Sequence, residues 1–160
     1  MPDTAFQHPY GAAFVGEMKN LNIVEPGTAN APSSIVTSGE IFAIEVHWEV
    51  AGPIAPALNP AYKWNARVFF ESIGPGGEGQ LGATVVVPYT THTAGNPALG
   101  SPSYHYKATL TGLSLVNPPA TPTRAYRLIT VITMDDGATP AVPVEIAGYL
   151  DGPIVQVVTV

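Results

Sequence analysis

The chain has 160 residues, no cysteine and 46% hydrophobic residues, so it can form one domain with its own core but neither a disulfide nor a thiolate metal site. Charged residues make up only 11% of the chain, against about 25% in an average soluble domain. The net charge is −6 and the six basic residues form no run, which argues against a nucleic-acid partner.

The N-terminal residues have no basic start followed by an apolar stretch, so the sequence shows no signal peptide. No run approaches the ~20 apolar residues that a membrane span needs. We therefore expect a cytoplasmic protein without membrane insertion, although an exported chain after processing would look the same.

Weak patterning in residues 1–18 predicts an extended arm or an edge strand, with residues 12–15 as its best strand candidate. Alternation of apolar and polar residues predicts a first strand over 20–25, and a polar, turn-rich run follows up to residue 39. The strongest strand signal lies at 40–50. There every second residue is apolar, namely Phe42, Ile44, Val46, Trp48 and Val50.

The same period predicts further strands along the chain, at 62–72, 81–88, 103–115, 125–134, 142–149 and 154–160. Gly152 and Pro153 either separate the last two strands or bend a single strand. The glycine-rich run 74–79 lacks the strand-to-helix setting of a phosphate-binding loop and is predicted to be a plain connection.

Seven or eight strands without a helical period predict an all-β fold, an antiparallel β-sandwich that occupies residues 1–160 as a single domain. An immunoglobulin-like arrangement fits best, because Trp64 lies on the third strand and Tyr126 near the start of a late strand. The inter-sheet cysteine pair of antibody domains is missing. A jelly roll is the second choice.

Glu45, His47 and Glu49 share one face of the strongest strand. We expect a solvated polar face on which Arg67 or Lys63 of the next strand pairs with these glutamates. A cation or substrate site is the alternative, and it needs ligands from a neighbouring strand. His92 and His105 flank a loop that could bring them together, but the chain has no zinc-type histidine spacing, so surface histidines are expected.

Asp135, Asp136 and Asp151 are weak candidates for a metal site, because carboxylates at one end of a sandwich can bind calcium. Turn roles fit them better, since Asp-Asp-Gly is typical of a hairpin. We predict no bound metal and no cofactor. Without a nucleophile motif or selected carboxylate pair, we also predict that the protein is not an enzyme.

Low charge and proline-rich loops favour a non-catalytic structural or protein-interaction module, a subunit of a larger assembly with a protein partner or further copies of itself. Phe69 breaks the polar face of its strand, and residues 154–160 would template strand addition from a sheet edge. The candidate interaction residues are Phe69, Tyr89, Ile154, Val155, Val157 and Val158. The alternative is a module that binds carbohydrate or calcium at the loop ends, where several tyrosines lie, although core packing explains them better.

Overall fold

The computed structural model describes residues 4–24 and 34–160. Two short 3₁₀ helices, η1 (Gly11–Ala13) and η2 (Ala55–Ala57), accompany ten strands in the described residues. The strands are β1 (Val15–Val24), β2 (Ile35–Thr37), β3 (Phe42–Ala51), β4 (Lys63–Ser72), β5 (Glu78–Gln80), β6 (Val85–Pro88), β7 (Thr93–Ala94), β8 (Ser103–Leu113), β9 (Thr123–Asp135) and β10 (Pro143–Val158).

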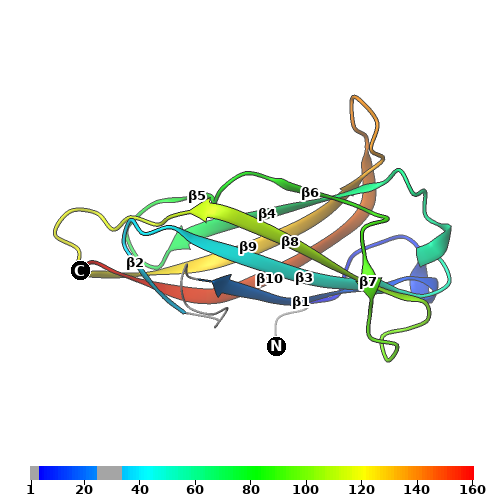
Figure 1. The fold of residues 1–160 in the computed structure, drawn as a ribbon, viewed down its shortest axis with the longest axis horizontal. Coiled ribbons are helices and arrows are strands. Elements are labelled where there is room, and N and C mark those ends of the chain that lie inside the picture. The colour runs from blue at the N-terminus through cyan, green and yellow to red at the C-terminus, as the bar shows by residue number, and fades with distance from the viewer. Residues whose placement is uncertain (1–3, 25–33) are drawn as a thin grey trace.

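The strands form two sheets that stack face to face and run along the length of the molecule (Figure 1). The small sheet has the order β1-β3-β8-β7, and the large sheet the order β2-β10-β9-β4-β5, with β6 on β4. All pairs are antiparallel except β2 with β10. The predicted all-β sandwich is confirmed. The structure has more strands than expected because β2, β5 and β7 are only two or three residues long.

Aromatic side chains fill the middle of the sandwich. Trp48 of the small sheet and Trp64 of the large sheet meet edge to face, with ring centroids 5.9 Å apart. Tyr106, opposite Trp48 in the register, stacks on it at 5.7 Å. The Tyr106 hydroxyl donates to the Tyr89 carbonyl at 2.6 Å, and the Tyr89 hydroxyl donates to the Ala55 carbonyl at 2.5 Å. These two tyrosines therefore belong to the core.

The N-terminal segment joins the two sheets. The Thr4 carbonyl accepts a hydrogen bond from Met18 of β1, while Gln7 exchanges two backbone hydrogen bonds with Ala147 of β10. Between these contacts Phe6 enters the core beside Trp64, at a ring distance of 5.8 Å. The expected arm is thus docked. The strand expected at 12–15 is wrong, because η1 occupies Gly11–Ala13 and β1 starts only at Val15.

Irregularities explain where other strand boundaries differ from expectation. A bulge between Met18 and Asn20 shifts the parity of β1, so the residues before it fall out of phase with the alternation at 20–25. At Gly152 and Pro153 the structure favours the bent single strand, since β10 continues through a second bulge between Asp151 and Ile154.

Candidate functional site

A polar cluster covers the outer face of the small sheet, where the sequence places Glu45, His47 and Glu49. Strand pairing sets His105 of β8 opposite Glu49, and Lys107 opposite His47. The expected pairing with Arg67 or Lys63 is wrong, because the chain crosses after β3 and β4 lies in the other sheet. The neighbours of β3 are β1 and β8, which supply the cross-strand partners instead.

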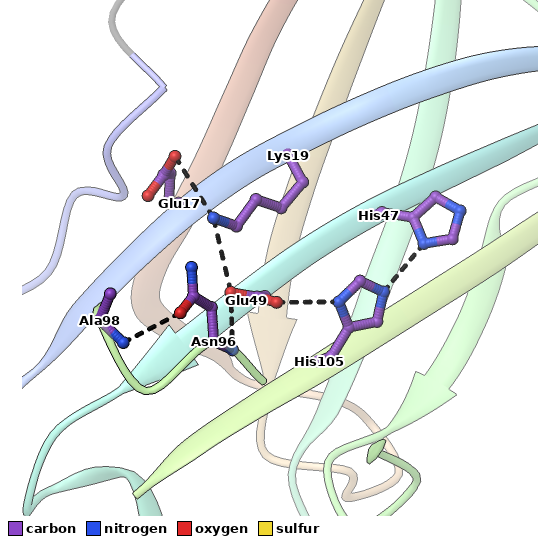
Figure 2. Close-up of polar contacts among 7 residues, drawn as sticks. All are labelled: Glu17, Lys19, His47, Glu49, Asn96, Ala98 and His105. Carbon is purple, nitrogen blue, oxygen red and sulfur yellow. Dashed lines mark hydrogen bonds and ion pairs between the residues drawn. The ribbon is translucent and has the colours of Figure 1, made fainter. Parts of the chain in front are cut away.

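A continuous chain of polar contacts runs across these three strands, and Figure 2 shows most of it. His105 is its centre: its Nδ1 lies 3.0 Å from Glu49 Oε1 and its Nε2 lies 2.9 Å from His47 Nδ1. The other oxygen of Glu49 lies 3.5 Å from the ammonium of Lys19 and accepts the backbone N–H of Asn96 at 3.4 Å. At the far end, His47 Nε2 lies 3.6 Å from Glu45 Oε2.

Burial and neighbouring charges determine which side chains in this series of polar contacts are ionised. Glu49 is only 6% exposed. Burial alone would raise the pKa of Glu49, but the hydrogen bonds from His105 and Asn96 and the charge of Lys19 outweigh it, so the pKa lies below its usual value. Burial, followed by the charge of His105, holds the pKa of His47 below its usual value, although Glu45 partly opposes this. At neutral pH, Glu49 is therefore charged and His47 is neutral.

The hydrogen-bond geometry fixes where protons can reside in the histidine pair, His47 and His105. Glu49 can only accept, so His105 Nδ1 carries a proton, and His105 Nε2 then accepts from His47 Nδ1. In this neutral state His47 Nε2 presents a lone pair to the carboxylate of Glu45. One added proton would bind at His47 Nε2 and give this nitrogen a donor that faces Glu45. A second would set two N–H groups against each other at 2.9 Å.

A pocket of about 400 Å³ opens beside the histidine pair. Its walls are His47, Thr91, His92, Thr93, His105 and Lys107. The segment around β7 thus brings His92 and His105 to one site, as the loop between them allowed. His92 is held there by stacking on Tyr104, with ring centroids 3.9 Å apart.

No group of three or more His, Asp or Glu side chains in the described residues is placed to hold a metal ion. Asp135 accepts from Gly137 N–H and from the Asn65 amide, each at 2.7 Å. Asp136 accepts backbone N–H groups from Ala138 and Val142. Asp151 forms an ion pair with Arg127 at 3.6 Å. In the strand register Asp151 lies opposite Ile129, and Ile129 is six residues, or ~20 Å, from Asp135 along β9. The three aspartates are therefore not brought together.

The candidate interaction residues divide between core and surface. Tyr89, Val155 and Val157 are buried, so their side chains are not available to another molecule. Residues 154–160 could template strand addition only from a free edge, and 156–158 do not lie on one, because β2 pairs with β10 there and Val158 lies opposite Thr37. Phe69 is half-buried and Ile154 is 54% exposed, both on the outer face of the large sheet.

Comparison with known proteins gives no assignment. The chain matches no protein-family model. No curated protein is significantly similar to it either. Among the described residues, neither short helix has the length or apolar character to cross a membrane.

Sequence reasoning missed Lys19, Lys107, Thr91, Thr93 and Asn96 as parts of the site. One signal was present for Lys107: it shares strand parity with His105 and opposes that of the core residues Tyr106 and Ala108. Lys19 sits at the β1 bulge, where simple alternation fails. Thr91, Thr93 and Asn96 reach the site through the fold of a connection, which has no period to follow.

Proposed function

We propose that this protein is an immunoglobulin-like, non-catalytic interaction module that self-associates through the outer face of its large sheet. The observation that carries the proposal is an apolar patch in the middle of that face, which comprises Phe69, Ile129, Val131, Tyr149 and Ile154. Phe69 pairs with Ile129, and Val131 pairs with Tyr149, so the patch crosses β4, β9 and β10. Tyr149 is 48% exposed and Ile154 is 54% exposed. Such a patch on a sheet face favours contact with another apolar surface.

The charges around the patch favour a second copy of the chain as the occupant. Arg67 and Arg127 lie beside the apolar residues, and so do Glu71 and Asp151. Glu71 is directly opposite Arg127, which is also 3.6 Å from Asp151. A face with both signs in balance can pair with itself across a two-fold axis, because each arginine can meet a carboxylate of the partner copy.

The strand order supports the immunoglobulin-like part of the proposal. In that fold the strands A, B, E and D form one sheet and C, F and G the other. If β1, β3, β4, β7, β8, β9 and β10 are taken as A to G, the observed orders β1-β3-β8-β7 and β10-β9-β4 agree with it. Trp64 then lies on C, and Tyr126 near the start of F points its hydroxyl at the upstream Val116 carbonyl, 3.5 Å away.

The carbohydrate or calcium alternative has weaker support. Asp135 and Asp136 are engaged by turn N–H groups, and Tyr89 and Tyr106 are committed to the core. That leaves the loop ends with few of the groups that either ligand would need.

Sedimentation velocity over concentrations up to about 1 mM tests self-association, because even a dimer whose dissociation constant is about 1 mM, with a binding free energy of about −4.1 kcal/mol, is then substantially populated. We expect a concentration-dependent dimer, and we expect Tyr149→Glu to weaken it at least tenfold, since a charge in an apolar contact costs more than about 1.4 kcal/mol. Val116→Glu is the matched control, because Val116 is 66% exposed in a loop outside the patch. A wild-type protein that stays monomeric at every concentration, or equal weakening by both variants, would contradict the proposal.

A further inference from the structure

The pocket beside the histidine pair has an unusual lining: every side chain can donate a hydrogen bond and none is acidic. Lys107 makes no ion pair with any acidic residue in the described part of the chain, although the protein as a whole is acidic. His92, Thr91 and Thr93 likewise make no side-chain hydrogen bond to a described residue. Four neighbouring donors, all on exposed residues, thus lack an acceptor among the described residues.

We infer that this pocket binds a small molecule through an oxyanion, a phosphate or carboxylate group, and that binding is accompanied by uptake of a proton by the histidine pair. An oxyanion supplies the acceptors that Lys107, His92 and the two threonines lack, and the ammonium gives it a fixed positive charge. The volume of about 400 Å³ exceeds that of a bare ion and lies within the ordinary range for small-molecule sites.

The charged groups around the histidine pair explain why anion binding is accompanied by uptake of a proton. Without ligand, the charged groups nearest the histidine pair are Glu45 and Glu49 on β3 and Lys107 on β8, and His92 lies across the pocket. On β1, Lys19 contacts Glu49 and Glu17 contacts Lys19. Burial and the nearby cations keep His47 neutral in that state. The negative charge of a bound anion opposes the effect of burial and of these cations, so it favours protonation of His47. The added proton lies on His47 Nε2 and faces Glu45, so every nitrogen of the pair then has a hydrogen-bond partner.

The same features disfavour a metal ion at this position. The ammonium of Lys107 stands directly opposite His47 in the register and would repel a cation. His105 can turn only one nitrogen to a metal, because the other donates to Glu49. The described residues contain no third ligand in place.

Histidine side-chain NMR on the full chain tests the inference with inorganic phosphate and acetate as probes, in a cationic buffer. The chain has four histidines. We expect saturable shifts at His47, His92 and His105 with at least one probe, but none at His8, which lies against Phe14 at 4.9 Å, away from the pocket. Since one proton accompanies binding, affinity should rise as the pH falls, by up to about tenfold per pH unit. The probe that saturates first identifies the preferred oxyanion.

Lys107→Gln should weaken binding at least tenfold, and Lys63→Gln is its control because it removes the same charge from the other sheet. Three results would overturn the inference: no saturation by either probe up to about 100 mM, which is about a hundredfold above a millimolar dissociation constant; equal loss in the two lysine variants; or saturable shifts with zinc chloride and with neither oxyanion.

Discussion

His105 shows how a single side chain can connect distant parts of a sheet face. It contacts Glu49 with one nitrogen and His47 with the other, and both partners come from a strand more than fifty residues earlier, as their separations of 56 and 58 show. Only one of the two nitrogens that face each other, His47 Nδ1 and His105 Nε2, can carry a proton without repulsion at 2.9 Å.

The lowered pKa values of His47 and Glu49 predict loss of stability in acid. A histidine whose folded pKa lies below 6.5 contributes stability that is complete above pH 6.5 and is lost as pH falls toward the folded pKa. Glu49 contributes likewise above pH 4.5 and loses its contribution below that value. Thermal unfolding should show Tm falling from pH 6.5 downward, and more steeply below pH 4.5.

The variant His47→Gln isolates the contribution of His47 to this acid dependence, to which His8 also contributes because burial lowers its pKa. It should make the Tm profile below pH 6.5 less steep while leaving the fall below pH 4.5 in place. His92→Gln is the matched control, because it removes a histidine from the same pocket but outside the chain of polar contacts. A profile that is unchanged in His47→Gln would show that the pair does not govern stability in this range.

Among the elements, the N-terminal segment depends on two glycines that leave room for Phe6. A Cβ at Gly16 would lie 2.5 Å from the Phe6 ring, and one at Gly148 would lie closer still. The segment can bridge β1 and β10 only because both facing positions lack a side chain.

A double-mutant cycle on Phe6 and Gly148 tests this fit. Phe6→Ala should lower the free energy of unfolding by about 3–5 kcal/mol, as for other buried aromatics. Gly148→Ala should cost about 1–3 kcal/mol in the wild type through overpacking, and much less in the Phe6→Ala background, where the ring is gone. Urea unfolding of the four proteins gives the coupling. Additive losses would mean that the ring does not press on Gly148.

The last strand is the second element with a testable role. Val157 lies on the core-facing side of β10 and is buried, whereas Ile154 is exposed on the outer face. Val157→Ala should cost about 1.5–2 kcal/mol for two buried methyl groups. Ile154→Ala should stay within about 0.5 kcal/mol. Urea unfolding measures both, and equal effects would contradict the placement of β10.

Strands and their partners differed in how far sequence could predict them. Regular alternation identified β3 and β4 nearly to the residue, because a half-buried strand imposes a period of two. The same rule predicted that Glu45, His47 and Glu49 share a face. It could not predict that β8 rather than β4 lies beside them, because strand neighbours are decided by long-range packing. Three-residue β2 offers too few positions for any period.

At the scale of the whole molecule, the contact between Trp48 and Trp64 joins the two sheets at the centre, and Phe6 closes one side against Trp64. The core residues of both sheets form one continuous cluster. Unfolding should therefore be a single cooperative transition. Calorimetric and van't Hoff enthalpies should agree, and two resolved heat-absorption peaks would contradict the single-domain prediction.

The two tryptophans are the only ones in the chain, and each belongs to a different sheet. Their indole rings are close enough for energy transfer between them, and Tyr106 and Tyr89 are close enough to transfer excitation energy to them. Intrinsic fluorescence thus reports the separation of the layers without an added dye. Binding of a ligand or partner that shifts one sheet relative to the other would change the emission maximum and the fluorescence anisotropy.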